Sequence, residues 1–272
     1  RRFGSSRLTQ VVRLRAGEHH VEFDCRLDWQ ERHRLLKVEF APDLRAMEGI
    51  SEIQYGWIRR PNDRSTQYGK DRFEVCQQRW SALCDGGRGM AVLNDCRQGL
   101  SFHDNVLRLT LQKGAMAPDM DADRGTHRFR YALAFWEGPL DGAALSRMAL
   151  AFAVPLDRVP DRSAPAWSLL EMRPDPSDGA GRDCGLLVDA VKLADDGSGD
   201  LVVRMHEARG TRSRGCLKLN FPVGAAVWTN LVERPIDRPG SQSGDAGVRP
   251  DGTLPLELGA FEIRTLRIRP GA

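Results

Sequence analysis

The sequence predicts an all-β, mainly antiparallel protein: a large β-sandwich or supersandwich domain followed by a smaller C-terminal β-sandwich. Three observations support this. Apolar and polar residues alternate with period 2 through most of the chain, clusters of Gly, Pro, Asn and Asp separate the alternating runs, and only one segment has helical spacing. With 272 residues, 41% of them apolar, the chain is long enough to bury such a core.

The strongest strand pattern is "HVEFDCRLDW", residues 20–29. Its odd positions are apolar or sulfur-bearing: Val21, Phe23, Cys25, Leu27 and Trp29. Its even positions from Glu22 onward are charged, so we expect one buried and one solvated face. The same alternation predicts strands in "LLKVEF" (35–40), "LRLTL" (107–111) and "FRYALAF" (129–135).

The segment "DGAALSRMALAFA", 141–153, departs from this alternation. Its spacing predicts one short helix, with Leu145, Met148, Ala149 and Phe152 on one face. We place the first domain at 1–155 and a proline-containing linker at 156–165. Strand patterns such as "GLLVDAVKL", "LVVRMHE", "CLKLNF" and "FEIRTLRI" then predict the small sandwich at 166–272.

Charge and hydropathy exclude two classes of partner. The 40 basic and 37 acidic residues are well mixed and give a net charge of +3, so we expect no nucleic-acid binding. We interpret the densest basic stretch, "EARGTRSRG" (207–215), as a solvated hairpin turn. No apolar run approaches the roughly 20 residues that span a bilayer, so we expect no membrane partner. The chain lacks an initiator Met, which suggests a piece of a longer protein.

The sequence also predicts that this chain holds no catalytic group, metal or other cofactor of its own. Its six cysteines include no C-x-x-C pair, which indicates reduced thiols and a cytoplasmic protein. Asp119, Asp121 and Asp123 are spaced like the start of a calcium loop. Arg124 and Arg130 stand where such a loop needs Gly and Glu, however, and a cationic side chain opposes Ca²⁺ binding.

The stretch "AVLNDCRQGLSF", 91–102, places a polar cluster at the end of a buried strand. Asn94, Asp95 and Arg97 together offer the donors and acceptors that bind sugar hydroxyls. The alternative is a turn in which Asp95 accepts hydrogen bonds from the amides of its own loop. The residues alone leave both possibilities open.

Residues 91–99 of this stretch end a longer one, "FEVCQQRWSALCDGGRGMAVLNDCRQG" (73–99), that resembles the C-terminal region of glycoside hydrolase family 38, the α-mannosidases. That family typically shows FEVxxHKWxDLSExxYGVxLLNDCKYG. "DWQERHRLLKVEF" (28–40), "SEIQYGWIRRPNDRST" (51–66) and "PDMDADRGTHRFRYAL" (118–133) are similar to other family motifs, and 187–210 resembles its terminal sandwich. Gln78 replaces the usual His, and Arg97-Gln98 replaces Lys-Tyr.

The resemblance implies a retaining enzyme that hydrolyses terminal α-mannosides on a separate N-terminal barrel. That barrel holds zinc and an Asp nucleophile, and this chain lacks its motifs. The chain would then be the C-terminal β region, packed on the barrel and lining the substrate cleft, and inactive alone. The loop with Asn94, Asp95 and Arg97 would either bind mannose hydroxyls or brace the barrel.

Two other functions stay open. A stand-alone carbohydrate-binding module needs exposed aromatic platforms, for which Trp57, Trp80 and Trp136 are the candidates. A purely structural or assembly domain needs no contact with sugar.

Overall fold

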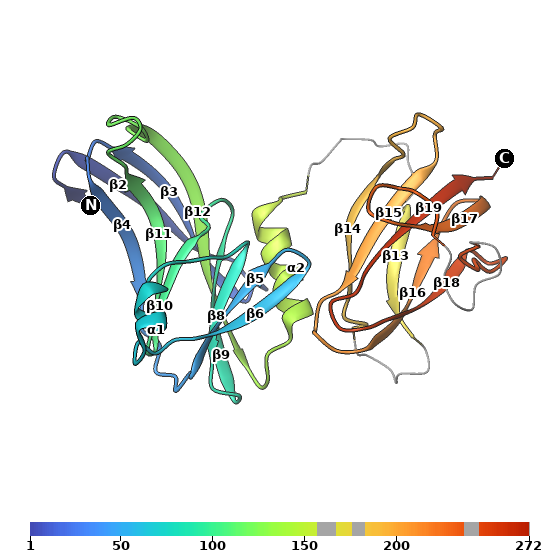
Figure 1. Cartoon of the computed structure of the whole chain (residues 1–272), viewed down its shortest axis with the longest axis horizontal. Helices are drawn as coiled ribbons and strands as arrows, with labels where there is room; N and C mark the ends of the chain where they lie inside the picture. The colour runs from blue at the N-terminus through green and yellow to red at the C-terminus, as the bar shows by residue number, and fades with distance from the viewer. Residues whose placement is uncertain (157–166, 176–182, 237–244, 272) are drawn as a thin grey trace. The chain divides into compact units, whose positions relative to one another are not determined.

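The computed structural model describes residues 1–156, 167–175, 183–236 and 245–271. It contains two compact units (Figure 1). The first comprises Arg1–Asp141 and Leu145–Leu156, and the second comprises Gly142–Ala144 and the described residues from 167 onward. Of the linker predicted at 156–165, only Leu156 lies within the described residues.

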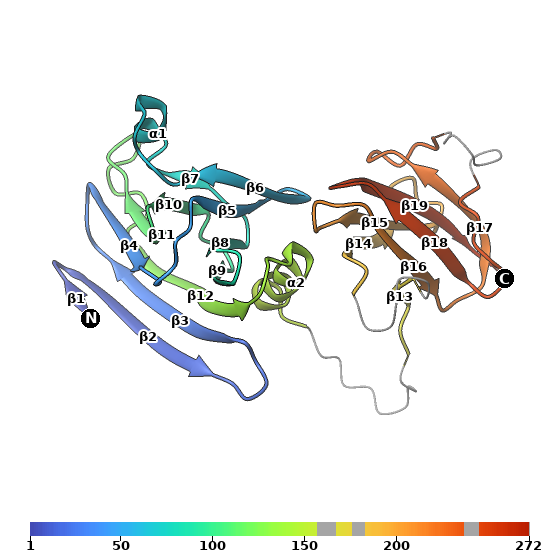
Figure 2. The ribbon, with the colours of Figure 1, turned by 90° about the horizontal axis from the view of Figure 1, so that it is seen from below.

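The first unit is a sandwich of two antiparallel sheets (Figure 2). The larger sheet has eight strands in the order β1 (Arg2–Phe3), β2 (Ser6–Leu14), β3 (His20–Trp29), β12 (Gly125–Glu137), β9 (Arg88–Asn94), β8 (Trp80–Cys84), β5 (Glu48–Ile53) and β6 (Gly56–Pro61). The smaller sheet has the order β4 (Arg34–Phe40), β11 (Val106–Gly114), β10 (Gly99–His103) and β7 (Val75–Cys76). The predicted all-β class is therefore confirmed.

The central strands β8 and β9 of the larger sheet are buried on both faces, whereas the outer strands β2 and β6 expose side chains to solvent. The face toward the smaller sheet follows the predicted alternation, and its core includes Leu27, Leu109 and Tyr131. The other face packs against α2 (Gly142–Ala153), which confirms the predicted helix. Trp80 anchors the helix, since its indole Nε1 donates to Ser146 Oγ at 3.0 Å. A second, short helix, α1 (Gln67–Asp71), was not predicted.

The second unit is also a sandwich of two antiparallel sheets. One contains β13 (Leu170–Pro174), β16 (Ser213–Leu219) and β18 (Thr253–Leu258). The other contains β14 (Leu186–Leu193), β15 (Leu201–Glu207), β19 (Ile263–Pro270) and β17 (Val223–Thr229). Their facing side chains, among them Met205, Leu217, Leu256 and Leu266, form one apolar core.

The interpretation of 207–215 as a hairpin turn is wrong. β15 pairs with β14 and β19, whereas β16 pairs with β13 and β18, so the segment connects the two sheets of the sandwich. Basic residues on a surface connection look the same in sequence whether the next strand returns to the same sheet or crosses over. In the described part of the chain, neither helix is long and apolar enough to cross a membrane.

All six cysteines are free thiols in the structure. We expect all six to react with a thiol reagent in denaturant without reductant. In the native protein at pH 8 we expect Cys96 to react slowly despite its exposure. Partial burial of its sulfur and a hydrogen bond with Asp95 raise the pKa of Cys96 to about 11, so the reactive thiolate is scarce.

Alkylation followed by peptide mass spectrometry measures both results, with exposed Cys76 as the internal comparison. Two or fewer reactive thiols in protein kept under inert gas would contradict the first expectation. Equal alkylation rates for Cys76 and Cys96 would contradict the second.

Candidate functional site

The loop that carries the predicted site residues connects β9 of the larger sheet to β10 of the smaller sheet. Asn94 ends β9 and is 1% exposed. Its side-chain oxygen accepts from the Arg97 amide at 2.6 Å, and its side-chain nitrogen donates to the Gln78 carbonyl at 3.0 Å. Asn94 therefore closes the turn from within, and its side chain is not accessible to a ligand.

The carboxylate of Asp95 is bound to β12. Its two oxygens accept from the Arg130 backbone amide at 3.1 and 3.0 Å, and Oδ2 lies 3.4 Å from Arg130 Nε. The Asp95 amide in turn donates to the Arg130 carbonyl at 3.3 Å. The side chain thus extends the pairing between β9 and β12 past the end of β9. These contacts resemble the amide-accepting alternative, although the amide belongs to a neighbouring strand.

Arg97 is placed differently from the other two. Its guanidinium carbon lies 4.3 Å from the centroid of the Phe129 ring, a cation–π distance. Its Nε is buried and has no hydrogen-bond partner among the described residues. Its two terminal amino groups also make no hydrogen bond to a described residue, and the side chain is only partly buried, so Arg97 is the predicted site residue with unused binding capacity.

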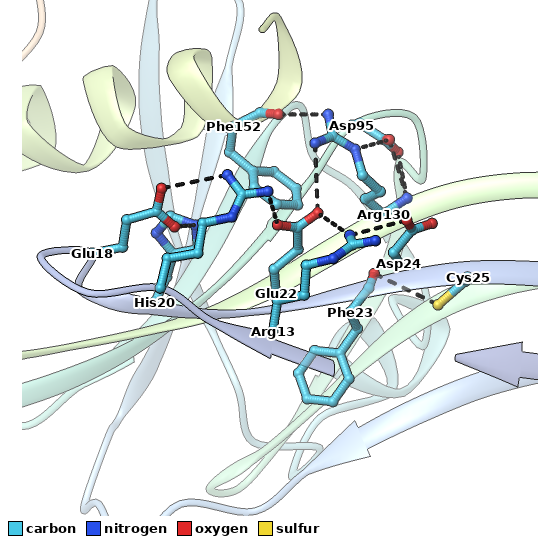
Figure 3. A network of polar contacts seen from close by, with 11 residues as sticks. Arg13, Glu18, His20, Glu22, Phe23, Asp24, Cys25, Asp95, Arg130 and Phe152 are labelled. Carbon is cyan, nitrogen blue, oxygen red and sulfur yellow. Dashed lines mark hydrogen bonds and ion pairs between the residues drawn. The ribbon is translucent and has the colours of Figure 1, made fainter. Parts of the chain in front are cut away.

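A network of charges supports the loop from below (Figure 3). The Arg130 guanidinium pairs with Asp95, and its Nη1 lies 3.7 Å from Glu22 Oε1. Its Nη2 donates to the Phe152 carbonyl at 2.8 Å. Glu22 also pairs with Arg13 and Arg15, each at 3.2 Å. One arginine thereby ties the loop to β3 and to the end of α2.

This network corrects the expectation of a fully solvated face on β3. Glu22 is 3% exposed, and three arginines, Arg13, Arg15 and Arg130, lie within ion-pair distance of its carboxylate. Neither Glu22 nor Arg130 was predicted from the sequence to be part of the site. The only available signals were the alternating charges of "HVEFDCRLDW" and the single Arg130 of "FRYALAF", and both are equally typical of a solvated face.

The aromatic candidates for a sugar platform are core residues. Trp80 is completely buried, and Trp57 and Trp136 are partly buried against the core beneath α2. Within the described ranges, no group of three or more His, Cys, Asp or Glu side chains is arranged to hold a metal ion.

Comparisons with known proteins agree with this architecture. Residues 1–121 match the family described as "Glycosyl hydrolases family 38 C-terminal domain". Residues 185–266 match "Glycosyl hydrolases family 38 C-terminal beta sandwich domain". The two matches follow one another along the chain and together cover most of it.

The proteins and the solved structure that are similar to this chain are named alpha-mannosidases. Alpha-mannosidase 2C1 of Homo sapiens is 34% identical over 267 residues, which cover 96% of this chain and 24% of that protein. An alpha-mannosidase of Saccharomyces cerevisiae is 25% identical over 89% of this chain and 23% of its own length. The crystal structure of an alpha-mannosidase from Enterococcus faecalis V583 superposes with a TM-score of 0.75, at 20% identity, over 96% of this chain and 29% of that one.

The chain thus spans about a quarter of the length of these curated relatives. The resemblance read from the sequence motifs is confirmed by both family matches and by the shared fold. This chain belongs to glycosyl hydrolase family 38 and corresponds to the C-terminal region of that family's proteins.

Proposed function

We propose that this chain is the C-terminal β region of a retaining α-mannosidase that hydrolyses terminal α-mannosides. One observation carries the proposal: a protein named alpha-mannosidase matches 96% of this chain, from the first sandwich through the second. In such an enzyme the chemistry takes place on a separate catalytic barrel of the same polypeptide. Zinc belongs to that barrel, and this region packs on it and forms part of the wall of the substrate cleft.

We further propose that the three predicted site residues have two different roles in the cleft wall. Asn94 and Asp95 hold the loop in shape, since their side chains are bound to Gln78, Arg97 and Arg130. Arg97 would then contact the mannoside, because its guanidinium makes no hydrogen bond to a described residue. A guanidinium donates to sugar hydroxyls, and its contact with Phe129 fixes its direction.

A cytoplasmic location completes the proposal. It is supported by six thiols that are all unpaired, as is usual for a protein in a reducing compartment.

Purified residues 1–272 should be catalytically silent. With zinc and a chromogenic α-mannoside, they should release product no faster than buffer, because the proposed barrel supplies the reacting groups. The parent enzyme, assayed at the same molar concentration, is the positive control. Product formation that survives re-purification and follows the protein peak would show that the chain carries its own active site.

A further inference from the structure

A pocket rich in arginine lies in the first unit. It is lined by the end of β6, by the connection from β6 to α1 and by α1 itself. Its volume is about 190 Å³, and its charged lining comprises Arg60, Arg64, Arg72 and Asp63. Neither the proposed mannoside site nor its supporting network uses any of these residues.

Only one of the two terminal nitrogens of the Arg60 guanidinium has a hydrogen-bond partner within the described ranges. Its Nη2 donates to the carbonyl of Cys76 at 3.3 Å, which fixes the guanidinium in place. Its Nη1 is buried and has no hydrogen-bond partner among the described residues. Burial, together with the neighbouring charge of Arg72, lowers the pKa of Arg60. Since arginine stays protonated in proteins, the positive charge is poorly compensated where it lies.

The other two arginines also lack an acidic partner in the described part of the chain. Arg72 lies 4.0 Å from the centroid of the Tyr68 ring and donates to the Tyr68 hydroxyl, which leaves its charge in place. Arg64 forms no ion pair with any described residue. The single carboxylate, Asp63, accepts instead from the amide and the hydroxyl of Ser65, at 3.0 and 2.5 Å.

We propose that this pocket binds a phosphate group, either free or as the phosphate monoester of a sugar. Three guanidinium groups against one carboxylate leave two positive charges uncompensated. A phosphate monoester carries about −1.5 to −2 charges at pH 7, which balances them. The planar fork of a guanidinium matches phosphate oxygens in two-point contacts, and three guanidinium groups line this pocket.

Calorimetric titration of residues 1–272 with sodium phosphate tests the proposal, with sodium chloride at matched ionic strength as the reference. We expect saturable binding of phosphate and a rise in the melting temperature that chloride does not produce. Arg64→Gln should weaken phosphate binding at least roughly tenfold, because it removes a charge-assisted hydrogen bond. Arg128→Gln makes the same change of charge at an exposed residue outside the pocket and should alter the affinity less than about twofold.

Arg64→Lys serves as a second variant that separates lost binding from a folding defect, since it keeps the positive charge but lacks the planar guanidinium. It should bind with an affinity between those of the wild type and Arg64→Gln. Mannose 6-phosphate distinguishes the two sources: tighter binding than inorganic phosphate identifies a sugar phosphate, and equal binding identifies free phosphate. Acetate binding as tightly as phosphate overturns the assignment. So does an equal loss of affinity in Arg64→Gln and Arg128→Gln, or no binding of phosphate beyond the chloride reference.

Discussion

Replacing Glu207 by Ala should lower the free energy of unfolding of the second unit by at least about 3 kcal/mol. Glu207 ends β15 and is completely buried. Its carboxylate accepts five hydrogen bonds of 2.8 to 3.2 Å, from the backbone amides of Arg209, Gly210, Thr211 and Phe261 and from the hydroxyl of Ser213. The substitution leaves these donors without a partner, because water has little access to this buried position and cannot take the place of the carboxylate.

The effect is large because the bonds join separate parts of the second sandwich. Three of the amides belong to the connection that crosses from β15 to β16, and the Phe261 amide lies just before β19. Each hydrogen bond to a charged group contributes about 1.5–3 kcal/mol, and contributions within one network do not simply add. The stated minimum is therefore well below the sum of the bonds.

Denaturant unfolding followed by circular dichroism measures the loss. Glu257→Ala is the matched control, because this glutamate is exposed and, among the described residues, its carboxylate pairs only with Arg212 and Arg214. It should change stability by less than about 1 kcal/mol. If both variants unfold at the same denaturant concentration as the wild type, the carboxylate of Glu207 does not hold the connection.

In the parent enzyme, Arg97→Ala should lower kcat/KM roughly tenfold to 150-fold, with little change in the melting temperature. That range corresponds to the loss of a desolvated charge-assisted hydrogen bond to substrate, about 1.5–3 kcal/mol. If the bond forms equally in the ground and transition states, KM rises. If it strengthens as the sugar ring distorts, kcat falls.

Asp95→Asn should show the opposite pattern. It removes the charge that pairs with Arg130, so the melting temperature should fall while kcat/KM below it stays close to wild type. Gln98→Ala, at an exposed position in the same loop, should change neither quantity. A melting curve and a Michaelis curve on each variant decide the roles. If Arg97→Ala melts early and keeps wild-type kcat/KM, Arg97 is structural and the proposed contact with substrate is wrong.

The sandwiches could be predicted because their strands lie between a core and solvent. Burial of one face imposes period 2, as in β3, where Cys25, Leu27 and Trp29 are all buried. α2 was predictable for the same reason, because its apolar face packs on the sheet. The strands β13, β17 and β18 were not singled out, since their patterns contain Pro, Gly or few large apolar residues.

The electrostatic features could not be predicted. Glu22, Glu207 and Arg130 look like solvated charges in sequence, and their roles depend on partners distant in the chain. The polar run at Asn94 was a valid signal of an unusual loop. Sequence could not show, however, that Asn94 and Asp95 bind their own domain whereas Arg97 keeps a buried donor unused.

The position of β12 has a consequence for how the polypeptide is made. This strand pairs with β3 over Gly125–Ala134 and with β9 over Tyr131–Glu137, although both of those strands are synthesised earlier. A ribosome therefore releases two hairpins, β2–β3 and β8–β9, whose inner edges stay open until residues 125–137 emerge. Open strand edges are templates for wrong pairing, and late closure prolongs their exposure. A nascent chain that stalls before Gly125 would leave both edges available to other polypeptides.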